Sequence, residues 1–408
     1  MKLPEINIGL IGHVAHGKTI LTKALTGKLT LKHSEELKRG ITIKLGYADA
    51  AIFKCKDCNY YFTNAMSTEK CPRCFSSNIE NIRTISFLDA PGHETLMVTV
   101  LTASALMDGA ILVIASNEKV PQPQTKEHLK AIELAGIKNV VVAQTKIDLV
   151  RDKQKLLENY NQIKEFLKNT HISDAPIIPV SAEYNVNINY LIEAIEEYIP
   201  TPKRNENASA RFYAIRSFDI NKPGTKIKDL KGAVLGGSVV QGKFEVGDEI
   251  EIKPGYLYKG KYYQLNAKIE SIQKSGKIVE KAGCGGLVGL MLNLDPSIAR
   301  EDFLAGRIVG KMNELPQETY ELELEINLLE RFVGTEEERK VEPIKVNETL
   351  LINAACQRTV GIVKNVRNNI VEIQLKLPII IEKDYRILIS RQFSGSWRLI
   401  GYGKSLQL

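Results

Sequence analysis

The segment Gly12-His13-Val14-Ala15-His16-Gly17-Lys18-Thr19 restricts the possible folds of this chain more than any other segment. It fits the pattern G-x-x-x-x-G-K-[ST], follows the strand-like apolar run Ile6–Ile11, and opens a helical apolar pattern over Thr19–Thr26. A glycine-rich turn in that position lets backbone N–H groups surround phosphates, while the lysine adds positive charge and the hydroxyl can bind Mg²⁺. We therefore predict a nucleotide-binding α/β domain whose phosphate loop includes Ala15, His16, Gly17, Lys18 and Thr19.

The first half of the chain alternates strand and helix patterns, which predicts a mostly parallel sheet covered on both faces. Further strands are expected at Thr84–Leu88, Ala110–Ala115, Asn139–Ala143 and Pro176–Val180, and helices at about 94–107, 124–135, 154–168 and 188–198. Prolines 200 and 202 end this pattern, and beyond them the apolar period changes from 3.6 to 2. That change predicts two small antiparallel β-barrels, with domains at 1–203, 204–316 and 317–408.

Composition narrows the class of protein further. The 408 residues are 44% hydrophobic and 25% charged, which excludes collagen-like, low-complexity and wholly disordered chains. No apolar run approaches the ~18–20 residues of a membrane span. The start of the chain has no apolar signal core. We expect a cytoplasmic protein without a membrane partner.

Three further segments can complete a guanine-nucleotide site. Asp89 follows a predicted strand and can hold a Mg²⁺-bound water, and the Gly92 N–H can meet a γ-phosphate. In Thr145-Lys146-Ile147-Asp148, the Asp148 carboxylate can accept from N1–H and the amino group of guanine, and the Lys146 stem can cover the base. Ser181 and Ala182 can offer a backbone N–H to the guanine carbonyl. Each short pattern, taken alone, also occurs in ordinary turns and strand ends.

Four of the six cysteines form two Cys-x-x-Cys turns that are twelve residues apart, Cys55/Cys58 and Cys71/Cys74. Four thiolates can close a tetrahedral site that suits Zn²⁺, with iron as the main chemical alternative. Because the protein would supply all four ligands, the role is structural. The segment at about 53–76 could be a rigid projection that a partner binds. We favour the alternative, a loop that the metal holds together because it lacks a hydrophobic core of its own.

The basic residues are concentrated near the C-terminus. Residues 357–408 hold nine Lys/Arg and three Asp/Glu, which is a net charge of +6 out of the +7 of the whole chain. An acidic partner such as RNA fits this excess, and a solvated basic face explains it about equally well.

Together these segments resemble the translational GTPases of the elongation factor Tu superfamily, and most closely the gamma-subunit family of archaeal and eukaryotic initiation factor 2. The segments that carry the resemblance are 33–46, Asp89-Ala90-Pro91-Gly92-His93-Glu94, Pro121–His128, Ser217–Gly224 and Trp397–Gly403. The match covers nearly the whole chain, and the short start resembles archaeal members.

The resemblance implies roles for matching residues. Thr42 would lie in the first switch and reach Mg²⁺ together with Thr19 and Asp89, and residues 89–94 would form the second switch. His93 occupies the position that orients the attacking water in related factors. The family also implies a zinc knuckle at the cysteines, GTP hydrolysis, delivery of methionylated initiator tRNA to the small ribosomal subunit, and a heterotrimer with alpha and beta subunits.

Two positions depart from the family pattern. Ala15 stands where the family has Asp, and Thr145 where it has Asn. We expect Thr145 to make fewer bonds to the base and the phosphate loop, at a cost of ~0.5–1.5 kcal/mol per lost hydrogen bond. Guanine specificity should persist through Asp148, while unaided hydrolysis should be slow.

Three alternatives remain open at this stage. A selenocysteine-specific elongation factor shares the layout but lacks the paired Cys-x-x-Cys turns. The GTPase subunit of a sulfate-activating enzyme shares the three domains. Its metabolic function would not explain a zinc-binding segment or an excess of basic residues near the C-terminus. A nucleotide-binding scaffold that never hydrolyses is favoured only by Ala15 and Thr145.

Overall fold

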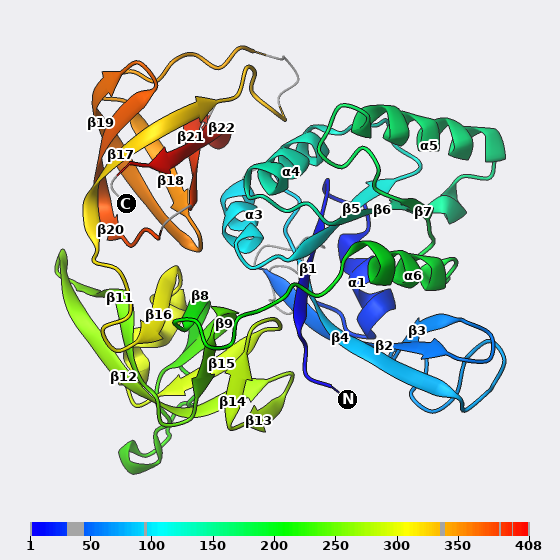
Figure 1. Ribbon diagram of the computed structural model, residues 1–408, viewed down its shortest axis with the longest axis horizontal. Helices are drawn as coiled ribbons and strands as arrows, with labels where there is room; N and C mark the ends of the chain where they lie inside the picture. Colours follow the sequence, from blue (N-terminus) through cyan, green and yellow to red (C-terminus); the bar gives the residue numbers. More distant parts are fainter. Residues whose placement is uncertain are drawn as a thin grey trace. The chain divides into compact units, whose positions relative to one another are not determined.

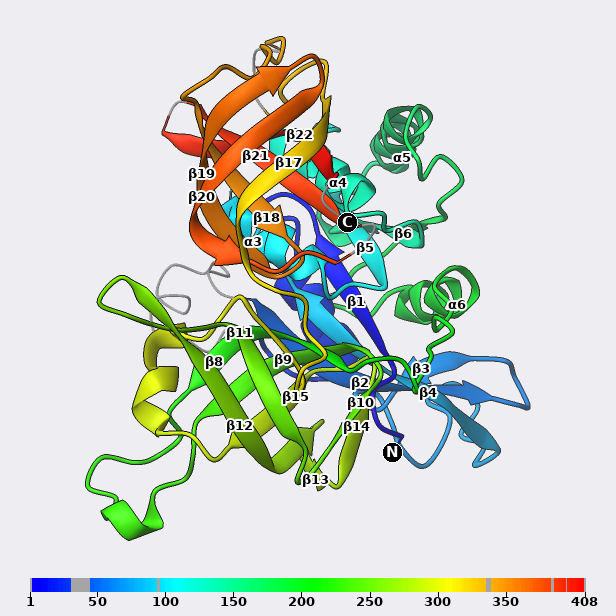
Figure 2. The ribbon, with the colours of Figure 1, turned by 60° about the vertical axis from the view of Figure 1, so that its left-hand side comes forward.

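The computed structural model describes residues 2–30, 45–93, 96–334, 339–382, 385–393 and 395–406. The chain forms two compact units, one comprising Met1–Pro202 with Phe332–Arg339, the other Lys203–Arg331 with Lys340–Leu408 (Figures 1 and 2). In the described parts no helix is long and apolar enough to cross a membrane.

The first unit is built on a seven-stranded sheet. Its order is β3-β2-β4-β1-β5-β6-β7. The strands are β1 (Ile6–Ile11), β2 (Gly46–Cys55), β3 (Tyr61–Thr63), β4 (Ile79–Asp89), β5 (Gly109–Ala115), β6 (Val140–Thr145) and β7 (Ile177–Pro179). Strands β4, β1, β5, β6 and β7 are parallel, as the alternation of strands and helices predicts.

Helices cover both faces of this sheet. They are α1 (Lys18–Thr26), α3 (Met97–Ser104), α4 (Pro123–Leu134), α5 (Lys153–Leu167) and α6 (Ile188–Tyr198), with the short 3-10 turn η2 (Ile147–Leu149) after β6. Helices α1 and α6 lie on one face and α3 and α4 on the other (Figure 1). The fully buried strand residues Ile8 and Val113 pack with Leu21 of α1 and Leu191 of α6 in one core. Gly27 ends α1 with a φ of 72°, the left-handed conformation expected of a glycine cap.

The edge of the sheet differs from the expectation. Strands β2 and β3 are antiparallel, and β2 pairs with β4 from Gly46 opposite Asp89 to Cys55 opposite Ile79. Sequence analysis placed no strand at 46–55, because its small residues give no clear period.

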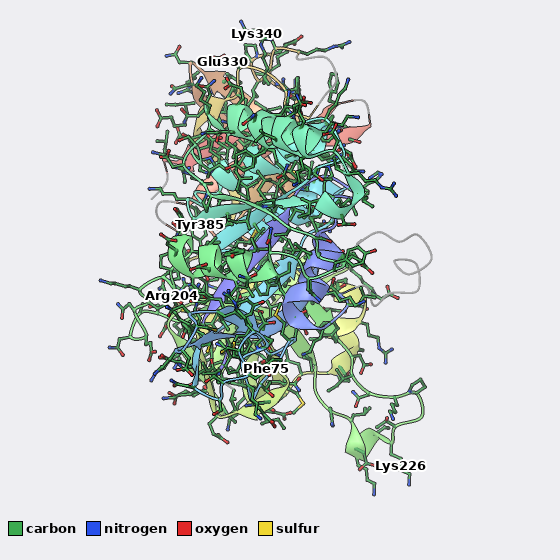
Figure 3. The ribbon with its side chains drawn as sticks, turned by 90° about the vertical axis from the view of Figure 1, so that its right-hand side faces the viewer. Phe75, Arg204, Lys226, Glu330, Lys340 and Tyr385 are labelled. Carbon is green, nitrogen blue, oxygen red and sulfur yellow. The ribbon has the colours of Figure 1, made fainter. Side chains whose placement is uncertain are left out.

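The second unit contains two closed six-stranded antiparallel barrels. The first consists of β8 (Arg211–Phe218), β9 (Val234–Gln241), β11 (Glu249–Tyr258), β12 (Lys261–Lys274), β15 (Val288–Leu292) and β16 (Arg307–Lys311). Shorter elements attached to it are β10 (Lys243–Glu245), β13 (Lys277–Val279), β14 (Lys281–Gly283), η3 (Ile227–Asp229) and η4 (Pro296–Asp302). Lys226 lies in the long β8–β9 connection (Figure 3).

The second barrel has the order β17-β20-β19-β18-β21-β22. Its strands are β17 (Thr319–Leu328), β18 (Thr349–Ala354), β19 (Gln357–Arg367), β20 (Ile370–Ile379), β21 (Arg386–Phe393) and β22 (Ser396–Ser405). A polar joint connects the barrels: Arg211 is ion-paired with Glu382, and the hydroxyl groups of Tyr213 and Tyr385 are hydrogen-bonded. The two barrels predicted from the period-2 pattern are therefore confirmed.

Candidate functional site

The phosphate loop connects β1 to α1 and has a strongly curved backbone. Gly12, Ala15 and Gly17 have φ values of 139°, 61° and 90°. Glycine adopts such values freely, whereas an L-residue such as Ala15 is strained in the left-handed region. The buried Lys18 amine donates to the carbonyl oxygens of Gly12 (2.9 Å) and His13 (2.7 Å). This arrangement places a cation inside a cradle of backbone.

Burial also affects the charge of this lysine. Desolvation lowers the pKa of the Lys18 amine to about 8, although the nearby Asp89 carboxylate favours the charged form. A phosphate beside the amine would favour the charged form further, because opposite charges attract strongly where water is excluded. The loop therefore has the electrostatics of an anion site.

Two hydroxyl groups converge on the Asp89 carboxylate at the end of β4. Thr19 Oγ1 donates to Asp89 Oδ2 over 2.8 Å, and Thr30 Oγ1 donates to the same oxygen over 2.6 Å. Hydroxyl and carboxylate oxygens are the hard ligands that Mg²⁺ prefers. The donor set of Thr19 and Asp89 thus fits Mg²⁺. Thr42, the third predicted ligand, lies outside the described residues.

Gly92 lies directly against the phosphate loop. A Cβ atom on Gly92 would lie 2.5 Å from Lys18 Nζ and 2.9 Å from the backbone nitrogen of Val14, so only a glycine fits there. His93 follows it with an exposed side chain, and its carbonyl accepts from the Leu96 N–H over 2.9 Å. The segment predicted as the second switch therefore begins beside the phosphate loop. Its last residue, Glu94, lies outside the described residues.

The predicted guanine motif is fixed to the loop from the other side. The buried Thr145 hydroxyl, at the end of β6, donates to the carbonyl oxygen of His16 over 2.6 Å. Lys146 is left-handed at φ 59°, and its carbonyl accepts from Ser116 Oγ over 3.0 Å. Asp148 is exposed in η2. The Thr145 hydroxyl therefore reaches the loop backbone directly, and the expectation that it makes fewer bonds than an asparagine stays a prediction.

Ser181 differs from its predicted role in one respect. Its N–H donates to the carbonyl of Val186 over 3.2 Å, and the Val186 N–H donates back over 2.9 Å. Because the Ser181 N–H is already engaged, the Ala182 N–H is the better candidate to donate to a guanine carbonyl at this turn.

Sequence reasoning missed three polar residues that support the loop. His16 lies between the Val113 carbonyl (3.1 Å from Nδ1) and Glu118 (3.2 Å from Nε2), and burial lowers its pKa to about 4. A neutral imidazole donates through only one nitrogen, so these two contacts are not both hydrogen bonds at neutral pH. His128 Nδ1 accepts from the Gly12 N–H over 3.0 Å. The residues that were missed, Thr30, Glu118 and His128, stand 11 to 109 residues from Thr19 in sequence, and only the segment Pro121–His128 carried a signal, as part of the resemblance.

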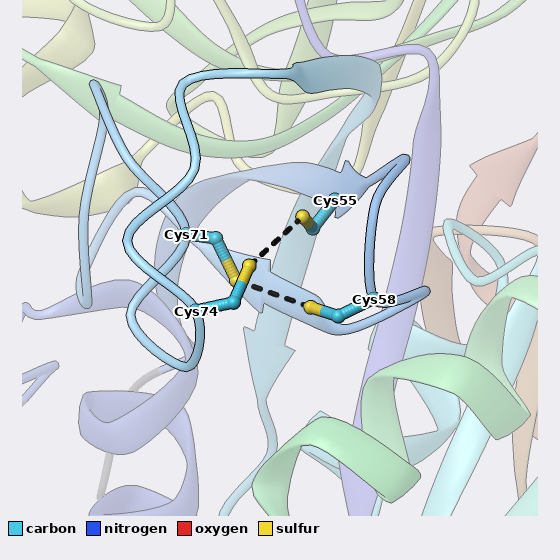
Figure 4. Close-up of side chains that lie close together, drawn as sticks. All are labelled: Cys55, Cys58, Cys71 and Cys74. Carbon is cyan, nitrogen blue, oxygen red and sulfur yellow. Dashed lines mark hydrogen bonds between the residues drawn. The ribbon is translucent and has the colours of Figure 1, made fainter.

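The four paired cysteines meet in one cluster at the end of the β2–β4 ladder that lies away from Asp89 (Figure 4). All four Sγ atoms lie within 4.8 Å of one another, with Cys55–Cys74 at 3.5 Å and Cys58–Cys71 at 3.6 Å. A tetrahedron with Zn–S bonds of ~2.3 Å has edges of about 3.8 Å. The thiols therefore fit a closed tetrahedral metal site.

The expectation that this knuckle lacks a core is wrong. Phe53 and Phe62 are stacked at 5.6 Å, and Tyr60 stacks on Phe62 at 6.4 Å. Cys55 and Cys71 are buried in the same cluster. Phe75 instead points outward, with 76% of its surface exposed (Figure 3).

Family models and similar proteins of known name point to the same family. The family model described as "Elongation factor Tu GTP binding domain" matches residues 4–201, and "Initiation factor eIF2 gamma, C terminal" matches residues 320–405. The chain is 54% identical over 403 residues to translation initiation factor 2 subunit gamma of Pyrococcus furiosus, covering 98% of this chain and 97% of that protein. The protein of the same name from Methanocaldococcus jannaschii is 52% identical over 406 residues, with the same two coverages.

Solved structures show the same fold at greater distance. A bacterial selenocysteine-specific elongation factor has a TM-score of 0.75 at 24% identity, covering 99% of this chain and 58% of that chain. Elongation factor SelB of Methanococcus maripaludis, with a GTP analogue, has a TM-score of 0.72 at 21% identity, covering 99% of this chain and 79% of that chain. At such identities the likeness concerns the fold alone.

Proposed function

Because the chain belongs to the translation initiation factor 2 gamma-subunit family, a family of translational GTPases, we propose that it carries methionylated initiator tRNA to the small ribosomal subunit. GTP and GDP would set the switch, and the chain would act in the cytoplasm in a heterotrimer with alpha and beta subunits. The observation that carries this proposal is the identity of 52–54% over 98% of the chain with relatives of that name. The selenocysteine-specific factor, our first alternative, is favoured only by a shared fold.

In the proposed nucleotide site, the phosphate-loop backbone and Lys18 bind the phosphates. Thr19, Asp89 and Thr42 would hold Mg²⁺, which when bound would neutralise phosphate charge. The proximity of Thr19, Asp89, Gly92 and Lys18 supports this assignment. Ala15, His16 and Gly17 line the same loop.

We assign the base to Asp148, Lys146, Thr145 and Ala182, with Ser181 holding the turn. The Asp148 carboxylate accepts the two guanine donors, a pair that adenine lacks. Replacing Asp148 by Asn gives an amide that can donate to xanthine O2, and should move the preference from guanosine to xanthosine nucleotides. An unchanged preference in competition binding would contradict the assignment.

His93 is the proposed group that orients the attacking water, because an imidazole nitrogen can accept a hydrogen bond from it. Its position immediately after Gly92 supports this role. We propose that hydrolysis by the isolated chain is slow, since Ala15 lacks the carboxylate of its relatives. Rapid single-turnover phosphate release by the purified chain would contradict that.

The cysteine cluster is proposed to hold one Zn²⁺ ion, with thiolates as ligands and a structural role. The ion would cross-link β2 to the 71–74 turn. We further propose that the functional domains span 1–203, 204–316 and 317–408.

The test is filter binding of methionylated initiator tRNA to the purified chain, with GDP and with a non-hydrolysable GTP analogue. Charged elongator tRNA is the control ligand, and the assay is repeated with the alpha subunit added. We expect binding that requires the GTP form and prefers the initiator. Nucleotide binding without tRNA binding in either state would favour the metabolic or scaffold alternatives.

A further inference from the structure

We propose that His128 is a positioning residue for the phosphate loop, which it holds in the nucleotide-binding shape by accepting the Gly12 N–H through Nδ1. The two residues are 116 positions apart, and the bond is 3.0 Å long and buried. His128 lies on α4 with 1% of its surface exposed. The proposal rests on the function proposed for the loop and adds a residue to it.

Gly12 is the point at which the loop leaves β1, and there is no room for a side chain there. Its φ is 139°, and a Cβ atom there would lie 2.3 Å from the carbonyl oxygen of Val113. The backbone of β5 thus passes close to Gly12 on one side. His128 accepts its N–H, and Lys18 donates to its carbonyl.

This arrangement links His128 to the cation of the site. The Gly12 peptide is held by a side chain from α4 and by the Lys18 amine, so a displacement of Gly12 changes where that amine lies. A buried N–H without an acceptor is costly, and a loop that loses its acceptor relaxes to satisfy it elsewhere. Part of the binding free energy of the nucleotide would then be used to return the loop to its nucleotide-binding conformation, which lowers the affinity.

The chemistry of the bond fixes the tautomer of His128. Because the backbone N–H donates, Nδ1 must carry a lone pair, and the ring proton sits on Nε2. The titratable groups whose charges act on the ring are Lys18 of α1 and His13 and His16 of the loop. Burial and these neighbours keep the pKa of His128 near 3, so the ring remains an acceptor at neutral pH.

The experiment compares His128→Asn, His128→Gln and His128→Leu in the full chain. Asn places an amide oxygen close to the position of Nδ1, whereas Gln reaches the position of Nε2 and Leu has no acceptor. Affinity for a fluorescent GDP analogue is measured together with the unfolding midpoint. His171→Leu is the matched control, since that histidine contacts the Ile137 carbonyl away from the loop.

We expect Gln and Leu to weaken nucleotide affinity roughly 5- to 100-fold, and Asn to retain it within about threefold. Equal losses for Asn and Gln, or a lower unfolding midpoint with unchanged affinity, would overturn the proposal. If the Leu variant fails to fold, the Asn–Gln pair still decides.

A second measurement does not depend on nucleotide. Histidine ¹⁵N spectra of the nucleotide-free chain should show one neutral Nε2–H ring that the Asn variant lacks. A protonated or Nδ1–H ring at His128 would overturn the proposal. The expected tautomer in a chain that binds no guanine nucleotide would instead contradict the proposed function.

Discussion

Thr145 Oγ1 lies 2.6 Å from the carbonyl oxygen of His16, so a threonine hydroxyl ties the guanine motif to the phosphate loop. An asparagine at this position would bring an amide with two N–H donors and a carbonyl acceptor, whereas the threonine hydroxyl brings a single donor and acceptor lone pairs on one short-reaching oxygen. The structure therefore shows the threonine hydroxyl bound to the loop, and a contact to the base is what an asparagine amide could add.

Thr145→Val keeps the shape of the side chain and removes the donor. We expect a loss of about 1–3 kcal/mol in nucleotide binding or in unfolding free energy, because the buried His16 carbonyl loses its partner. Thr145→Ser, the control, keeps the hydroxyl and should stay close to the parent. Thr145→Asn should gain up to roughly tenfold in GDP affinity. Isothermal titration measures all three, and equal affinities for Val and Ser would contradict the tether.

Ala15 stands in the left-handed region at φ 61°. Ala15→Gly should raise the unfolding free energy of the first unit by ~1 kcal/mol, because glycine adopts this conformation without strain. Ala24→Gly makes the same exchange inside α1 and should lower it by about 1 kcal/mol. Urea unfolding followed by a probe in the first unit tests the opposite signs; a loss in both variants would mean that Ala15 carries no strain.

His128 also predicts a pH dependence. Its pKa is about 3 in the folded chain, below the ordinary 6.5, so the unfolded chain binds a proton that the folded chain does not. Stability is therefore fully present above pH 6.5 and falls by ~1.4 kcal/mol per unit as the pH drops towards 3. In His128→Asn this contribution is missing, which gives a shallower fall between pH 7 and pH 5. Parallel slopes for the parent and the variant would show that His128 is charged in the folded chain.

Metal content tests the cysteine cluster. The purified chain should hold one zinc ion, and Cys71→Ser should lower the zinc content sharply, because three thiolates do not close a tetrahedral site. Cys284→Ser, outside the cluster, is the control and should retain the metal. Elemental analysis with GDP binding should show zinc loss without a matching loss of nucleotide affinity. Iron in place of zinc would correct the metal but not the site.

Sequence alone went furthest where one local pattern determines the conformation. The phosphate loop, the cap at Gly27 and the barrel strand around Val371–Leu377 follow from glycine positions and apolar periods, which depend on neighbouring residues only. The spacing of the Cys-x-x-Cys pairs likewise predicts metal binding from the local sequence alone.

Contacts between distant segments could not be predicted in the same way. The bond between Gly12 and His128, the donation from Thr145 to His16, and the engagement of the Ser181 N–H depend on how strands and helices pack. Strand β2 was missed because Ala48, Ala50 and Ala51 give no period. The knuckle core was missed because Phe53 and Phe62 meet only when β2 pairs with β3.

Because β2 pairs with β4, the two predicted metal sites lie at opposite ends of one antiparallel β-ladder. Asp89 lies at one end of the ladder and Cys55 at the other, and ten paired residues span ~30 Å. Fraying that starts at the cysteines has to break the ladder pair by pair before it disturbs the carboxylate. The exposed surface of the knuckle, which includes Phe75, is therefore the part of this ladder where we expect a label or a surface attachment to disturb the nucleotide site least.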